Sequence, residues 1–212
     1  MLKLYAFPPS PRSFKALWAA HHLGIEYELV LVDLSKGAQR TAEYAAINPN
    51  SKAPAIDDGG YVLWESNAIV EYFAALRPDS GILPQDARAR LAITKWMYWE
   101  SAHWDQACAV FAFERVVKRL FSMGEPDPRE IQRGTQIFER AGKVLDSELR
   151  NHRYLAGNHF TAADLSVGAD MCIAEPAQYP LEGFAGIRRW LDDIRSLPSW
   201  QRTIAMQRLP GS

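Results

Sequence analysis

The fold is decided by residues 54–63, which read Pro54-Ala55-Ile56-Asp57-Asp58-Gly59-Gly60-Tyr61-Val62-Leu63. Two short apolar runs flank an Asp-Asp-Gly-Gly spacer, and such a spacer between strand formers predicts a hairpin of two antiparallel strands. A proline suits the start of the first strand, because it has no N–H to donate to the sheet. Residues 65–76 follow with apolar side chains at helical spacing, so a helix is predicted directly after the hairpin.

The residues before the hairpin predict a parallel strand–helix–strand unit. Residues 2–7 are a short run of strand formers, and Ser10-Pro11 is typical of a capped helix start with proline at the first helical position. The helical spacing ends at Gly24, residues 27–32 predict a second strand, and Thr41 begins a short helix. The order βαβαββα places two parallel strands beside the antiparallel hairpin. It predicts an α/β N-terminal thioredoxin-like domain, with helices on both faces of a small mixed sheet.

Strand patterns disappear after the first third of the chain. Helical periodicity runs over residues 86–121, 131–149 and 187–197, with Pro198 ending the last run. Thr161-Ala162-Ala163-Asp164 is a capping box that marks the start of a further helix. We therefore predict a thioredoxin-like domain at residues 1–77, a Pro/Gly-rich linker at 78–85 and an all-α helical bundle at 86–212.

Composition excludes several classes of function. Of the 212 residues, 48% are hydrophobic and 23% charged, as in ordinary globular proteins, and the net charge of -1 disfavours nucleic acid as a partner. The two cysteines, Cys108 and Cys172, lie far apart, and the five histidines have no metal-ligand spacing, so neither a disulfide framework nor a metal site is expected. No signal peptide and no membrane span are predicted. This pattern suits a cytoplasmic protein.

Three short segments carry polar residues where strands and helices meet. Ser10 and Ser13 lie at the first strand–helix junction, where a hydroxyl and a helix N-terminus together would stabilise a thiolate. Taken alone, the fragment favours a simple cap role for Ser10. Ala53 precedes Pro54, and a cis bond there would turn the Ala53 backbone outward to pair with an extended peptide, although trans is favoured from sequence alone.

The third segment begins the helix after the hairpin. The terminal N–H groups of this helix and the Ser66 hydroxyl suit a carboxylate, and the Glu65 carboxylate suits an ammonium group one bond away. An acidic first turn with a polar cap is the plainer interpretation. Each segment is weak alone, but all three are expected at the same end of the predicted sheet.

Taken together, these motifs resemble those of the cytosolic glutathione S-transferase family over essentially the whole chain, nearest to its serine-type bacterial, theta, phi and delta groups. The signature here is Asn48-Pro49, then Ala53-Pro54, then Glu65-Ser66-Asn67-Ala68-Ile69, with the capping box at 161–164 in the second half. The resemblance implies a glutathione transferase that ionises the bound thiol and transfers it to a small apolar electrophile. It also implies a homodimer.

The resemblance assigns roles to individual residues. It implies that Ser10 is the catalytic hydroxyl donor to the glutathione sulfur, with Ser13 as its local competitor. It implies that Ala53, beside a cis Pro54, pairs with the peptide backbone, that Glu65 and Ser66 bind the γ-glutamyl end, and that Lys52 helps to neutralise the peptide. Phe7, His103 and Trp104 are the candidates for the electrophile pocket. For Trp104 and His103, packing in the core or at a dimer seam is an equal alternative, and for Trp96 and Trp99 packing is favoured.

Two positions depart from the family pattern. Gln39 stands where theta and delta relatives often carry a histidine for the glycyl carboxylate, so that interaction is reduced to a neutral hydrogen bond. Asn67 stands where relatives often carry an arginine. The rival interpretations are a non-catalytic glutathione- or partner-binding module and a storage protein for hydrophobic ligands. The serine and the intact Glu65-Ser66 pair favour the enzyme.

Overall fold

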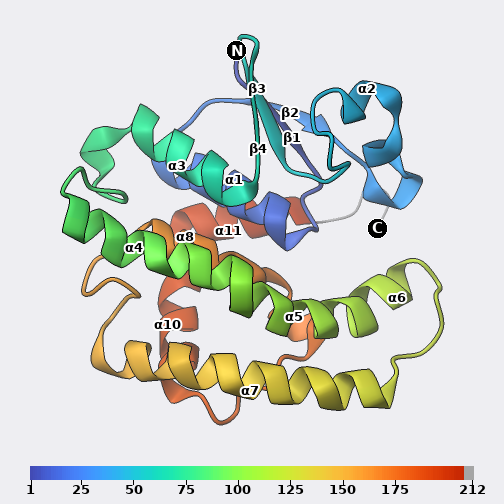
Figure 1. Cartoon of the computed structure of the whole chain (residues 1–212), viewed down its shortest axis with the longest axis vertical. Coiled ribbons are helices and arrows are strands. Elements are labelled where there is room, and N and C mark those ends of the chain that lie inside the picture. Colours follow the sequence, from blue (N-terminus) through green and yellow to red (C-terminus); the bar gives the residue numbers. More distant parts are fainter. Residues whose placement is uncertain (208–212) are drawn as a thin grey trace. The chain divides into compact units, whose positions relative to one another are not determined.

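The computed structural model describes residues 1–207, and the chain divides into two compact units (Figure 1). The first unit is Met1–Leu83 together with the segment that begins at Ser196, and the second is Pro84–Arg195. Residues 196–207 are predicted as part of the helical domain, but they pack with the first unit. Aromatic packing explains this placement, because the ring centroid of Trp200 lies 4.8 Å from those of both Phe14 and Trp18.

The first unit has the predicted mixed sheet. Its elements in chain order are β1 (Lys3–Ala6), α1 (Pro11–Leu23), β2 (Glu28–Leu31), η1 (Leu34–Lys36), η2 (Ala38–Arg40), α2 (Ala42–Ala45), β3 (Ala55–Asp58), β4 (Tyr61–Trp64), α3 (Ser66–Leu76), η3 (Pro78–Ser80), α11 (Pro198–Ile204) and η7 (Ala205–Gln207). The strand order is β2-β1-β3-β4, with β1 and β2 parallel and the other pairs antiparallel. The predicted thioredoxin-like arrangement is confirmed.

Alternation along β1 sets the two faces of this sheet. Leu4 and Ala6 are fully buried, while Tyr5 between them points to the opposite face and lies 6.1 Å from the ring of Tyr44 on α2. α1 and α3 pack against each other, and the buried residues of α1 include Phe14, Leu17 and Trp18. α1 ends as predicted, with Gly24 at φ +61, a left-handed conformation that favours glycine.

The second unit is entirely helical in its described residues. Its elements are α4 (Ala87–Trp99), η4 (Glu100–Trp104), α5 (Asp105–Phe111), η5 (Ala112–Val117), α6 (Lys118–Leu120), α7 (Pro128–Asn151), α8 (Ala162–Gly168), η6 (Ala169–Ile173), α9 (Ala174–Ala177) and α10 (Ala185–Arg195). The long helix predicted over 86–121 is present, but two π-helical segments, η4 and η5, interrupt it. Within residues 1–207, no helix is both long and apolar enough to cross a membrane.

The predicted capping box forms a buried polar link inside this unit. Asp164 Oδ2 accepts from the Thr161 amide at 2.9 Å, and Asp164 Oδ1 accepts from the Trp190 indole at 2.9 Å and from the Leu155 amide at 3.1 Å. Asp164 and Trp190 are both fully buried, so one carboxylate joins the start of α8 to α10. One sequence expectation needs correction: Pro198 does not only end a helix but occupies the first turn of α11.

Candidate functional site

The strand register brings the candidate segments of the first unit to one edge of the sheet. Tyr5 of β1 pairs with Ala55 of β3, and Ala55 in turn pairs with Trp64 of β4. The chain therefore leaves β1 towards Ser10, enters β3 from Pro54 and leaves β4 towards Glu65 at the same edge. β2 ends there too, because its last residue Leu31 pairs with Ala6, and η1 and η2 with Gln39 follow. The expectation of one shared edge is met.

The two serines of the first junction have different surroundings. Ser10 is half-buried at the N-cap of α1, and its side chain makes no capping hydrogen bond. Its backbone is fixed nonetheless, because the Ser10 amide donates to the Phe7 carbonyl and the Phe14 amide donates to the Ser10 carbonyl, both at 2.8 Å. Ser13 is fully buried, and its hydroxyl oxygen accepts from the Phe7 amide at 3.0 Å. Ser13 thus closes the turn that presents Ser10.

Hydrogen bonds from nearby side chains fix the backbone of the second segment, which contains Ala53 and Pro54. The Tyr44 hydroxyl and the Asn48 amide both donate to the Lys52 carbonyl, at 2.8 and 2.6 Å. The Ala53–Pro54 peptide bond is cis, whereas local sequence alone favoured trans. Because the β3 ladder begins at Ala55, the backbone of Ala53 lies just outside the sheet, while the Lys52 side chain is exposed.

The third segment has an unusual backbone. Glu65 has φ 75 and ψ 115, outside the regions that side-chain-bearing residues prefer, and such conformations cost of order 1–3 kcal/mol. Its carbonyl accepts from the Ile69 amide at 3.0 Å, so α3 starts immediately afterwards. The Glu65 side chain is exposed and Ser66 is buried in the first turn of the helix. A helix N-terminus with an adjacent carboxylate fits an amino-acid head group.

Gln39 lies half-buried in η2, beyond the end of β2. Its Oε1 atom is buried and has no hydrogen-bond partner among the described residues. An amide left in this state retains hydrogen-bonding capacity for a ligand. Gln39 therefore has hydrogen-bonding capacity left for a ligand at this edge.

The structure separates the aromatic candidates. Trp104 is fully buried, with its ring 4.9 Å from Phe138 and 6.0 Å from Trp99, as in core packing. His103 is exposed in the second unit, and Phe7 is buried in the first. Trp104 is the last residue of the π-helical segment η4.

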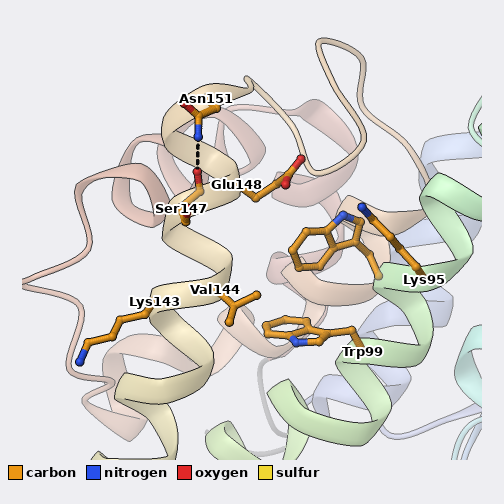
Figure 2. A pocket seen from close by; sticks show the side chains of 8 residues that line it. Lys95, Trp99, Lys143, Val144, Ser147, Glu148 and Asn151 are labelled. Atoms are coloured by element: carbon orange, nitrogen blue, oxygen red, sulfur yellow. Dashed lines mark hydrogen bonds between the residues drawn. The ribbon is translucent and has the colours of Figure 1, made fainter.

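Trp96 and Trp99 line a hollow of about 710 Å³ on the helical unit, between α4 and α7 (Figure 2). The other lining residues are Lys95, Lys143, Val144, Ser147, Glu148 and Asn151. Figure 2 shows the Val144 side chain pointing from α7 towards the Trp99 ring of α4. Trp96 is buried and Trp99 is half-buried. Packing against other side chains stays the predicted role of both.

Sequence reasoning missed two clusters. Glu100, Asp105 and Asp170 bring carboxylate oxygens within 4.8 Å of one another, although Asp170 is far from the other two in sequence. In the first unit, Lys15 is fully buried, and its ammonium donates to Asn67 Oδ1 at 3.1 Å. The only sequence signal for Lys15 is its place among small and apolar residues of α1.

Comparisons with known proteins find relatives that match nearly the whole chain. Residues 1–75 match the family model described as "Glutathione S-transferase, N-terminal domain". The chain is 31% identical to glutathione S-transferase 3 of Zea mays, covering 99% of this chain and 96% of that protein. It is 28% identical to glutathione S-transferase D7 of Drosophila melanogaster, covering 96% and 88%. It superposes with a TM-score of 0.85 and 29% identity on a theta class glutathione S-transferase of Xanthomonas axonopodis pv. citri solved with glutathione bound, covering 96% of both chains.

Proposed function

The chain belongs to the glutathione S-transferase family and is a glutathione transferase, and we propose that Ser10 activates the bound glutathione thiol. The observation that carries this proposal is the different hydrogen bonding of the Ser10 and Ser13 side chains. Ser13 has its oxygen engaged by the Phe7 amide in the interior, whereas the Ser10 side chain makes no capping bond at the half-exposed edge. Ser10 is therefore the hydroxyl available to a ligand.

The chemistry follows from the position of Ser10 at a helix N-terminus. A free thiol has a pKa near ~8.5, and lowering it by about 2 units requires roughly 2.7 kcal/mol of preferential interaction with the thiolate. A donated hydroxyl hydrogen bond and the partial positive charge of α1 supply interactions of that size. The thiol proton leaves to solvent. The sulfur then bonds to the electrophilic carbon, which either releases a leaving group with its electron pair or, in an addition, passes a π pair to a neighbouring atom that takes up a proton from solvent. Ser10 acts as a hydrogen-bond donor and never as a base.

The remaining residues of the sheet edge are proposed to bind the rest of the tripeptide. The Ala53 backbone beside cis Pro54 would pair with the cysteinyl residue as an additional strand would. Glu65 and Ser66 would bind the γ-glutamyl ammonium and carboxylate groups. Gln39, whose side-chain amide N–H can donate a neutral hydrogen bond to a carboxylate, and the exposed Lys52 are proposed for the glycyl end. The second substrate is proposed to be a small apolar electrophile.

Matched serine variants test the assignment. Ser10→Ala is expected to lower kcat by about two orders of magnitude or more, as loss of an oxyanion-type donor does, with a small change in glutathione affinity. Ser13→Ala, the control, is expected to keep kcat within a few-fold. If Ser13→Ala abolishes turnover and Ser10→Ala does not, the assignment is wrong. If glutathione binds and neither variant nor the natural chain shows turnover, the non-catalytic binding module is the better interpretation.

We also propose a homodimer, with the hollow between α4 and α7 at its seam. Leu91 and Tyr98 lie seven residues apart on one face of α4 and are 65% and 71% exposed, and Val144 on α7 is 49% exposed. Large apolar side chains gathered on one face are typical of an interface. Sedimentation of Tyr98→Glu should give a monomer, whereas Met123→Glu, at another exposed apolar residue, should stay dimeric. A natural chain that sediments as a monomer contradicts the proposal.

A further inference from the structure

Lys15 is a charged residue in the interior of the first unit, where an unpaired charge is energetically unfavourable. It lies on α1, five residues after Ser10, and its side chain is fully buried. Burying an ammonium group is unfavourable unless hydrogen bonds compensate for the lost water. Lys15 donates to the side-chain oxygen of Asn67 at 3.1 Å, across 52 positions of sequence. The bond therefore joins two helices that start at the same edge of the sheet.

The acceptor is next to the proposed binding residues. Asn67 is the second residue of α3, directly after Ser66 and two residues after Glu65. Glu65 has a positive φ of 75, and a strained conformation of this kind persists only where neighbouring contacts determine it. A bond from α1 to residue 67 fixes the first turn of α3 from the interior side. It thereby limits the positions that Glu65 and Ser66 can take.

We propose that Lys15 is a positioning residue that sets glutathione affinity by anchoring the N-terminus of α3 through Asn67. This inference rests on the proposed function, since it needs Glu65 and Ser66 to receive the γ-glutamyl group. It assigns a role to the buried lysine and to the asparagine that accepts its hydrogen bond. The neutral amide oxygen of Asn67 accepts a hydrogen bond from the Lys15 ammonium, whereas a second cation at residue 67 would repel it.

The test separates positioning from simple stability. Lys15→Met keeps the volume of the side chain and removes the donor, and it should raise KM for glutathione about tenfold or more, because hydrogen bonds to charged groups are among the stronger ones. The kcat at saturating glutathione and the KM for the electrophile should stay within about twofold, since Ser10 is untouched. Lys15→Arg can donate to the same oxygen and should restore the KM to within about threefold.

A double-variant cycle provides the control. Asn67→Leu removes the acceptor from the other helix and should raise the same KM, and Lys15→Met combined with Asn67→Leu should be no worse than the weaker-binding single variant. Additive effects overturn the proposal, as does an unchanged KM in a Lys15→Met protein that only melts at a lower temperature. If Lys15→Met does not fold, Lys15→Arg and Asn67→Leu decide the question. A natural chain that does not bind glutathione would instead refute the proposed function.

Discussion

Replacing each serine of the first junction by alanine should separate structural from chemical roles. Ser13→Ala removes the oxygen that accepts from the Phe7 amide at 3.0 Å, in a site with no exposed surface. The orphaned N–H then costs about 1–3 kcal/mol. For a chain of this size each kcal/mol lowers Tm by about 2–4 °C, so the expected loss is about 2–12 °C.

Ser10→Ala should leave stability almost unchanged. Caps normally contribute about 1 kcal/mol, but the Ser10 side chain makes no capping bond, so the change in Tm should stay below about 2 °C. The assay is thermal unfolding of both variants without glutathione, followed by circular dichroism and repeated in urea. The reasoning is refuted if Ser10→Ala proves the less stable variant, or if Ser13→Ala melts like the natural protein.

Three further changes have defined outcomes. Burial, with a smaller contribution from Arg202, lowers the pKa of His21 to about 4. The unfolded chain therefore binds more protons than the folded chain between about pH 6.5 and 4, so the free energy of unfolding should fall as the pH drops through that window. Urea titrations should show a less steep fall for His21→Gln. Asp164→Ala leaves the Trp190 indole and two buried backbone amides without their acceptor. It should lower the free energy of unfolding in urea by more than about 3 kcal/mol. A surface change such as Glu139→Ala should lower it by less than about 0.5 kcal/mol. Gln39→Ala should raise KM for glutathione about threefold, the size of one neutral hydrogen bond; an unchanged KM would remove Gln39 from the site.

Most of the fold could be predicted because local patterns and tertiary structure agree. The Asp-Asp-Gly-Gly spacer produces the β3–β4 hairpin, Gly24 ends α1, and Thr161 caps α8, all as the residues indicate. The π-helical segments could not be predicted, because residues 100–117 keep an ordinary helical pattern and packing decides the register. The assignment of α11 to the first unit likewise depends on aromatic contacts of Trp200 that no local pattern contains.

The candidate site was predictable in its residue types and less so in its geometry. The cis bond before Pro54 differs from trans by only about 0.5–1 kcal/mol in a free chain, so the surrounding fold decides it. Ser10 and Ser13 look alike in sequence, and the structure distinguishes them by burial and by the Phe7 amide that donates to Ser13. The burial of Lys15 runs against the usual exposure of lysine, so composition gives no signal for it.

The central claim is that the Ser10 hydroxyl stabilises the glutathione thiolate, and the most direct measurement is the ultraviolet thiolate absorbance of the bound tripeptide as a function of pH. In the natural protein the thiolate band should be half-developed about 2 pH units below the pKa of free glutathione. In Ser10→Ala, with glutathione still saturating, the midpoint should return towards the free value. An identical midpoint in the two proteins would contradict the account.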